Sequence, residues 1–312
     1  MPRSRSSTLP TYFALPALVT GLALTAPPVT AQQITSEPAA PSAQALEGRQ
    51  VVLVTGSTSG LGREVALAMA ERGAHVIVHG RNRDRGMAVV EEIASGPGSA
   101  TFYAADFASM AQVRALGEAV LRDFDRIDVL VNNAGIWLSG DNERYESEDG
   151  YELSFAVNYL SGYLLTKMLL PIIPRSTDSR IVNVASGAQS PIDFDDPMIE
   201  NGYSGGRSYG QSKLSQILHA FDLAAELDGT GIKVNALHPA TLMDTNMVLS
   251  AGVQPRSSVE DGLEAVMNLI VPGDLGTGQY YNGTQESRAN AQAYDQEARA
   301  ALRRLSDELV GP

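Results

Sequence analysis

The sequence predicts an α/β protein built on a doubly wound parallel sheet, and three observations lead to this prediction. Short apolar runs rich in Val and Ile alternate with longer amphipathic segments along the chain. The short runs are apolar at every position rather than at alternate ones, which is typical of strands covered on both faces. No internal repeat or change of composition interrupts the pattern after residue 49. We therefore expect one domain, with helices on both faces of the sheet.

The first 48 residues differ from the rest of the chain. Residues 1–31 combine a basic start, an apolar run over Phe13–Ala26 and small residues before Gln32. This order is typical of a secretory signal peptide, and an uncleaved membrane anchor or a misassigned start are the alternatives. Residues 32–48 are rich in Pro, Ala and Ser, which predicts a flexible linker into a domain at 49–312. We expect an exported or periplasmic protein, with a membrane-anchored or cytoplasmic one as the alternative.

The expected strands are continuous β-branched runs that end in Gly or in polar turn residues. They cover residues 50–56, 74–80, 100–106, 127–135, 179–186 and 231–240, with a last short strand at 278–283. The expected helices show the 3.6-residue spacing of apolar side chains, and Gly73, Pro171, Pro174 and Gly229 end three of them. They cover residues 61–73, 83–95, 109–124, 150–173, 209–229 and 289–311.

Composition excludes several classes of function. The formal net charge is −13 and the isoelectric point is about 4.7, which argues against a nucleic-acid partner. The chain has no cysteine, so disulfides and thiolate metal sites are excluded. Its four histidines show no metal-ligand spacing, and we expect no metal site.

Ligands on such sheets bind beyond the carboxyl ends of the strands. The first strand is followed there by the loop TGSTSGLG, whose glycines allow a tight turn and close approach of a phosphate to the backbone. This predicts a dinucleotide site. The loop residues expected to bind the cofactor are Gly56, Ser57, Ser59, Gly60, Leu61, Gly62 and Arg63.

The end of the second strand indicates which dinucleotide binds. An acidic residue usually meets a free ribose 2′-hydroxyl at this place, but here Gly80 is followed by Arg81, and Arg63 lies just past the glycine loop. A guanidinium suits a 2′-phosphate, so we expect NADP(H) and consider NAD(H) the less favoured alternative. A solvated basic helix start is the other explanation of Arg81. Asp106 and Phe107 are expected to bind the cofactor, with Asp106 at the adenine or, as the alternative, a cap of the next helix.

Tyr209 and Lys213 lie four residues apart in an expected helix, and therefore on one face. They belong to a set of motifs, TGSTSGLG, NNAG, VAS and YGQSK, whose order resembles that of the short-chain dehydrogenases/reductases over roughly residues 50–285. YYNG and ALHPATLMDTNM also resemble bacterial members related to the retinol-dehydrogenase-like branch. The resemblance implies a Rossmann-type fold and an oxidoreductase that interconverts a carbonyl and an alcohol.

The resemblance also implies roles for four catalytic residues. Tyr209 would be the general acid/base, and Lys213 would lower the pKa of its phenol and bind the nicotinamide ribose. Ser186 would hold the substrate oxygen. Asn158, polar within an apolar helix, would hold a water that links Lys213 to solvent, and a packing role is its alternative.

The remaining expectations concern the rim of the site. Asn132, Asn133, Ala134 and Gly135, from NNAG, are expected against the cofactor, together with Pro239, Thr241 and Thr245 after the sixth strand. The insertion at 189–207, Trp137, Leu138 and a mobile lid at 247–260 are expected to border a small-molecule carbonyl or alcohol substrate. We also expect a homo-oligomer with possible membrane association through its N-terminus. A non-catalytic NADP(H)-binding regulatory protein is the alternative function.

Overall fold

The structure is a computed structural model that describes residues 34–311, apart from 139–141, 177, 272 and 274. The predicted signal peptide or anchor lies outside the described residues. Among the residues that are described, no helix is both long enough and apolar enough to cross a membrane.

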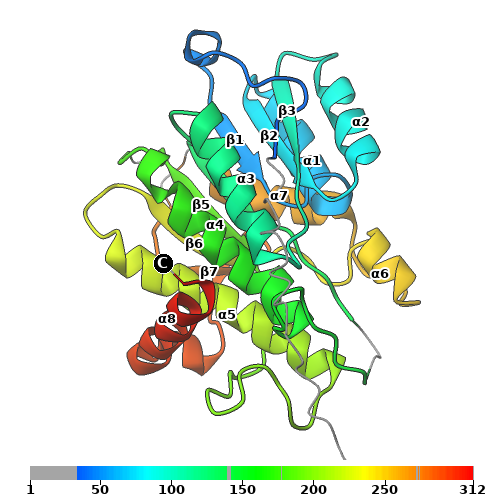
Figure 1. Cartoon of the computed structure of the whole chain (residues 1–312), viewed down its shortest axis with the longest axis vertical. Coiled ribbons are helices and arrows are strands. Elements are labelled where there is room, and N and C mark those ends of the chain that lie inside the picture. The colour runs from blue at the N-terminus through cyan, green and yellow to red at the C-terminus, as the bar shows by residue number, and fades with distance from the viewer. Residues whose placement is uncertain (1–33, 139–141, 177, 272, 274, 312) are drawn as a thin grey trace, which may run out of the picture. The chain divides into compact units, whose positions relative to one another are not determined.

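One eight-stranded sheet forms the centre of the domain (Figure 1). Its strands are β1 (Val51–Val54), β2 (His75–Gly80), β3 (Ser99–Ala104), β4 (Val129–Asn132), β5 (Arg180–Val184), β6 (Lys233–His238), β7 (Tyr280–Asn282) and β8 (Gln285–Ser287). The strand order is β3-β2-β1-β4-β5-β6-β7-β8, and only the β7–β8 pair is antiparallel. The order runs outward in both directions from β1 and β4, which confirms the predicted doubly wound parallel sheet.

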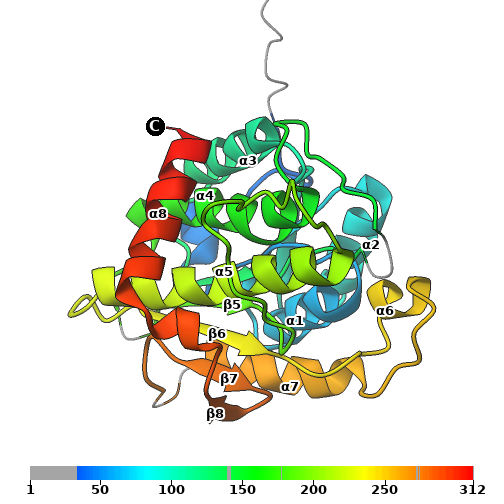
Figure 2. The ribbon, with the colours of Figure 1, turned by 90° about the horizontal axis from the view of Figure 1, so that it is seen from below.

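Helices cover both faces of this sheet (Figure 2). One face carries α1 (Gly60–Glu71), α2 (Arg83–Ile93) and α7 (Val259–Ile270). The other carries α3 (Met110–Asp123), α4 (Ser161–Leu169) and α5 (Gly205–Glu226), with α8 (Gln296–Val310) packed across α5. Each face buries its own apolar cluster, so the strands are apolar on both sides, as their sequences predict.

The segment predicted as a flexible linker makes specific contacts with the domain. The backbone of Glu37 exchanges two hydrogen bonds with Phe102 on the edge strand β3, at 2.9 and 2.7 Å. The Glu37 carboxylate pairs with Arg83, and Leu46, in a short 3-10 helix at Ala43–Leu46, joins the core. The Pro- and Ser-rich composition suggests a linker, but the unpaired edge of β3 provides a place for this segment to bind.

Five elements differ from the expectation, one of them the helix expected at 289–311, which is divided into a 3-10 helix, Ala291–Tyr294, and α8. The predicted helix at 150–173 contains a π-helix, η2 (Phe155–Leu160), that leads into α4. Helix α7 was not predicted, although Ser258 and Asp261 form a capping box at its start. The segment at 247–260, expected to be a mobile lid, begins inside a short helix, α6 (Asn246–Ser250). Strand β8 was also missed, because its three residues are exposed and polar.

Candidate functional site

The loops that follow β1, β4, β5 and β6 meet at the carboxyl edge of the sheet. The direction of winding changes between β1 and β4, and a crevice forms at such a point in open α/β sheets. Most of the residues predicted for the cofactor and for catalysis lie on these loops and on the helices that follow them, whereas Arg81 follows β2, and Asp106 and Phe107 follow β3.

The glycine loop after β1 is packed too closely to accept side chains. Gly56 has φ of +66°, and a Cβ there would lie 2.8 Å from Cα of Ala134. A Cβ on Gly62 would lie 2.4 Å from the side-chain amide of Asn133 and 2.5 Å from the carbonyl oxygen of Gly56. The loop therefore lies directly against the start of the NNAG segment.

The start of α1 fits an anion. Ser59 is the N-cap residue, and its side chain makes no capping hydrogen bond to the first turn. The amides of this turn and the positive end of the helix dipole are thus available to a diphosphate. Thr245 lies beside this turn, since a Cβ on Gly60 would lie 3.3 Å from its methyl group.

Thr55 joins the glycine loop to the end of β4, and the sequence analysis did not single it out. Its hydroxyl accepts hydrogen bonds from the amides of Asn133 and Ala134, both at 3.0 Å. The Asn133 side chain donates to the carbonyl of Thr55 at 2.9 Å. A hydroxyl residue directly before the first glycine is the sequence signal that could have indicated this role.

Several residues predicted to bind cofactor use their side chains elsewhere. The Ser57 hydroxyl donates to the carbonyl of Val54 at 2.7 Å and accepts from the amide of His79, so it closes the loop from within. Leu61 is buried in the core. Phe107 is buried as well, and its ring stacks on His79 with centroids 4.3 Å apart. Leu61 and Phe107 can therefore offer the cofactor only their backbone.

The two candidate arginines have different surroundings. Arg63 pairs with both Glu64 and Glu92. Arg81 lies 3.5 Å from the carboxylate of Asp106, and its side chain is 67% exposed. Asp106 also accepts a hydrogen bond from the amide of Ala108 at 3.0 Å, so it helps to turn the chain into α3. Arg81 therefore has fewer and longer ion pairs than Arg63, and it lies directly after β2.

Tyr209 and Ser186 are brought together by α5 and the end of β5. The side chains of Tyr209 and Ser186 lie together, close enough to interact, and Ser186 is itself buried. The Ser186 hydroxyl accepts from the amide of Ala188 at 3.1 Å. Trp137 lies beside this pair, with its ring 6.0 Å from that of Tyr209.

Lys213 lies one turn further along α5 and is 4% exposed. Its ammonium donates to the carbonyl of Val184 at 2.9 Å and to the side chain of Gln216 at 3.0 Å. It lies 5.7 Å from the centre of the Tyr209 ring. A Cβ on Gly135 would come within 3.4 Å of the ammonium, so that glycine keeps the space beside it open. Burial lowers the pKa of Lys213 to about 7.

The phenol of Tyr209 does not behave as the sequence analysis expected. We expected Lys213 to lower its pKa. In the structure, burial raises the pKa of Tyr209, and the interaction with the Ser186 side chain opposes that rise only in part. The degree of burial depends on tertiary packing, which the spacing of the two residues does not reveal.

Asn158 lies in the π-helix η2 and is buried. Its side-chain oxygen accepts from the amide of Ile136 at 2.7 Å, and its amide donates to the carbonyl of Ile136 and to Ser212 on α5. π-Helices are rare and occur often at functional sites. Asn158 thus connects the NNAG loop to the helix of Tyr209, beside Gly135 and Lys213.

Asn132, at the end of β4, makes its side-chain contacts inside the domain. The side chain of Asn132 points into the core, where it donates to Thr166 and Asn183, both at 2.9 Å, so it does not face the cofactor side as expected. Pro239 and Thr241 follow β6, and the Thr241 hydroxyl lies 3.0 Å from a ring nitrogen of His238.

The insertion at 189–207 packs on the first turns of α5. Gln211 donates to the carbonyl of Pro197 at 2.8 Å, and a Cβ on Gly210 would lie 2.4 Å from the hydroxyl of Ser190. Helix α6 lies in the loop between β6 and α7. Two backbone hydrogen bonds join the ends of this loop, from the amide of Arg256 to the carbonyl of Leu242 and from the amide of Asp244 to the carbonyl of Ser257. On it, Leu249 is 54% exposed.

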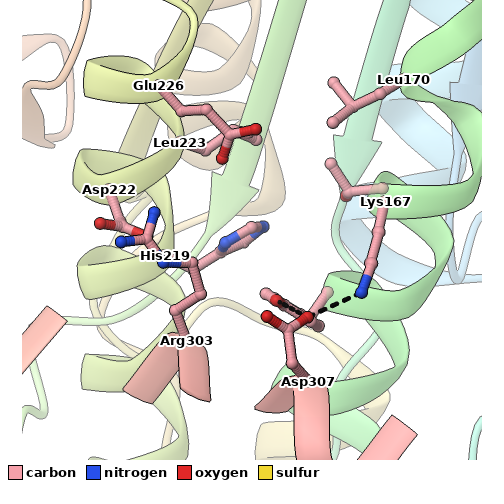
Figure 3. Close-up of a pocket in the computed structure, with 10 residues that line it drawn as sticks. Lys167, Leu170, His219, Asp222, Leu223, Glu226, Arg303 and Asp307 are labelled. Carbon is pink, nitrogen blue, oxygen red and sulfur yellow. Dashed lines mark hydrogen bonds and ion pairs between the residues drawn. The ribbon is translucent and has the colours of Figure 1, made fainter. Parts of the chain in front are cut away.

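A cavity of about 330 Å³ lies away from these residues, between α4, α5 and α8 (Figure 3). His219 lies ten residues beyond Tyr209 on α5, which corresponds to about 15 Å along the helix. The cavity is lined by the contacts that hold α8, including Lys167 with Asp307 at 2.7 Å and Arg303 with Asp222 at 3.2 Å. It belongs to the packing of α8 rather than to the predicted site.

Comparison with known proteins decides the family. The family model for short chain dehydrogenases matches residues 50–254. The chain belongs to the short-chain dehydrogenase/reductase family. It is therefore an oxidoreductase that uses a nicotinamide cofactor and acts on small molecules.

Similar proteins and solved structures agree with this assignment. Human retinol dehydrogenase 14 is 32% identical over 293 residues, which cover 84% of this chain and 86% of the human protein. A solved structure of an uncharacterised protein from Mycobacterium paratuberculosis is 29% identical, with a TM-score of 0.66 over 87% of this chain and 95% of that one. The landomycin C-6 ketoreductase, solved with NADP and rabelomycin, is 26% identical, with a TM-score of 0.62 over 77% and 96%. These similarities confirm the retinol-dehydrogenase-like branch of the family.

Proposed function

We propose that this chain is an NADP(H)-dependent reductase or dehydrogenase that interconverts a carbonyl and an alcohol with Ser186, Tyr209, Lys213 and Asn158. The observation that carries the proposal is the meeting of the Tyr209 and Ser186 side chains after β5, with Lys213 beside Gly135 of the NNAG segment, against which the glycine loop packs. A non-catalytic cofactor-binding protein has no need of a proton donor at this point.

The bound cofactor would supply or accept a hydride. On this proposal the Ser186 hydroxyl holds the carbonyl oxygen, and Tyr209 gives that oxygen its proton. Lys213 places a cation near the phenol and the ribose, with its two present acceptors fixing the direction of the side chain. Asn158 holds the chain just after NNAG and α5 in fixed positions relative to each other, because its side chain bonds both Ile136 and Ser212.

The preference for NADP(H) is supported by Arg81, because no acidic side chain directly follows β2 and Arg81 is exposed to solvent. A substrate with an apolar part is supported by Trp137 at 6.0 Å from Tyr209 and by the exposed Leu249 on α6. Retinaldehyde belongs among the substrates to be tried, because the relatives are named retinol dehydrogenases.

The test is a steady-state assay on a panel of aromatic, aliphatic and polyene aldehydes and ketones with NADPH and with NADH. We expect turnover of at least one carbonyl, with NADPH preferred. Tight NADPH binding without turnover on any member would favour the regulatory alternative. Homo-oligomerisation and membrane association through the N-terminus stay proposals, which light scattering and cell fractionation of the full chain would test.

A further inference from the structure

A buried carboxylate lies beside the helices that carry the proposed catalytic residues. Glu152 is 0% exposed and lies three residues before the start of η2. Its oxygens accept three hydrogen bonds, from the amides of Ser154 at 3.1 Å and Phe155 at 2.7 Å and from the hydroxyl of Ser208 at 2.8 Å. A buried carboxylate is costly unless donors surround it, and here the start of η2 and the side of α5 both supply donors.

The serine in this set belongs to a second row of side chains on α5. Ser208 directly precedes Tyr209, and Ser212 directly precedes Lys213, so the serine row is turned by about 100° from the Tyr–Lys row. The serine row contacts the segment that contains Glu152 and η2 at two points, one helical turn apart. Ser208 donates to Glu152, and Ser212 accepts from the Asn158 side chain at 2.9 Å.

We propose that Glu152 is a positioning residue. Through its hydrogen bond with Ser208 it fixes the position of α5 along its axis and its rotation about that axis, and so fixes Tyr209 relative to Asn158. The inference rests on the proposed function, because it assigns Glu152 to the reaction of Tyr209. One carboxylate caps the first turn of η2 and also bonds α5 one residue before the phenol. Glu152 acts through Ser208 and the two helices, so it is not itself a catalytic residue.

Ser208→Ala is the sharpest variant, because it removes the bond between the helices and leaves both amide bonds of the cap. Its matched control is Ser215→Ala, which removes another buried hydroxyl of α5, bonded only within that helix to the carbonyl of Gln211 at 2.9 Å. We expect Ser208→Ala to lower kcat about tenfold or more, since a small misplacement of a reacting group lowers the rate of the chemical step strongly. The KM for NADPH should stay within about twofold, and Ser215→Ala should match the wild type in both.

Glu152→Gln provides a second measurement. Glutamine cannot accept from all three donors, because one of its two polar atoms is itself a donor. We expect it to lower kcat at least as much as Ser208→Ala. The double variant should be no slower than the slower of the two single variants, because both changes act on the same cluster of hydrogen bonds around Glu152. Thermal unfolding of every variant reports whether it folds, and if Glu152→Gln does not fold, Ser208→Ala carries the test.

The outcomes separate the two proposals. Equal kcat in Ser208→Ala and Ser215→Ala would overturn the inference. A parallel loss of kcat, NADPH affinity and unfolding temperature in Ser208→Ala would also overturn it, because that pattern indicates a merely structural role. If Tyr209→Phe is as active as the wild type, or the wild type reduces no carbonyl, the proposed function fails and this inference fails with it.

Discussion

Charge at the end of β2 should set the preference between the two nicotinamide cofactors. Arg81 is exposed and near Asp106, whereas Arg63 is held by two glutamates. We expect Arg81→Ala to weaken NADPH binding by about 1–3 kcal/mol, the usual contribution of a charge-assisted hydrogen bond, and to leave NADH binding nearly unchanged. Fluorescence titration with both cofactors measures this. Equal effects on the two would make Arg63 the candidate for the 2′-phosphate.

Burial of Lys213 should make the stability of the ligand-free chain depend on pH. Its pKa is about 7 in the folded chain and near 10.5 when unfolded. Between these values the unfolded chain binds one more proton, so the free energy of unfolding rises with pH, by about 1.4 kcal/mol per unit for a single full proton. Lys213→Met lacks this contribution.

Urea unfolding at pH 7, 8 and 9 tests the Lys213 prediction. We expect the wild type to gain stability relative to Lys213→Met at each step. Parallel pH profiles for the two proteins would mean that the buried ammonium keeps its ordinary pKa, contrary to the effect of burial described above.

Helix α8 is held on the layer that carries η2, α4 and α5 by contacts that begin next to Asn158. The hydroxyl of Tyr159 lies 2.6 Å from that of Ser306 on α8, and both side chains are buried. We expect Tyr159→Phe to lower the free energy of unfolding by about 1 kcal/mol, as for a typical buried hydrogen bond, with kcat changed less than about twofold. Tyr145→Phe, at an exposed tyrosine, is the control. Equal stability of the two variants would contradict this account of α8.

Element type was predictable for most segments that carry their own pattern, although α7 was missed despite the capping box at its start. Continuous apolar runs such as Val51–Val54 indicated the parallel strands, and the motifs at their ends indicated the site. The contacts of the Asn158 side chain were not predictable, because its partners Ile136 and Ser212 are distant in sequence. The direction of the pKa shift of Tyr209 was missed for the same reason. Asn132 was placed on the wrong side because a strand end alone does not say which neighbour a side chain meets.

At the scale of the whole molecule, residues 34–48 act as part of the domain. They pair with the edge strand at Phe102 and bury Leu46, worth about 1.5–3 kcal/mol if fully buried. A chain that begins at Arg49 should therefore unfold at a lower temperature than one that begins at Ile34. Thermal unfolding of both chains under one set of conditions tests this, and equal midpoints would restore the linker interpretation.

The central claim is that Tyr209 is the proton donor of a carbonyl reductase, and Tyr209→Phe tests it most directly. The ring and its contact with Trp137 stay, while the hydroxyl beside Ser186 is lost. Loss of a general acid should lower kcat at least about 100-fold, with the Kd for NADPH, measured by fluorescence titration, within a few-fold of the wild type. Turnover near the wild-type rate in Tyr209→Phe would contradict the claim.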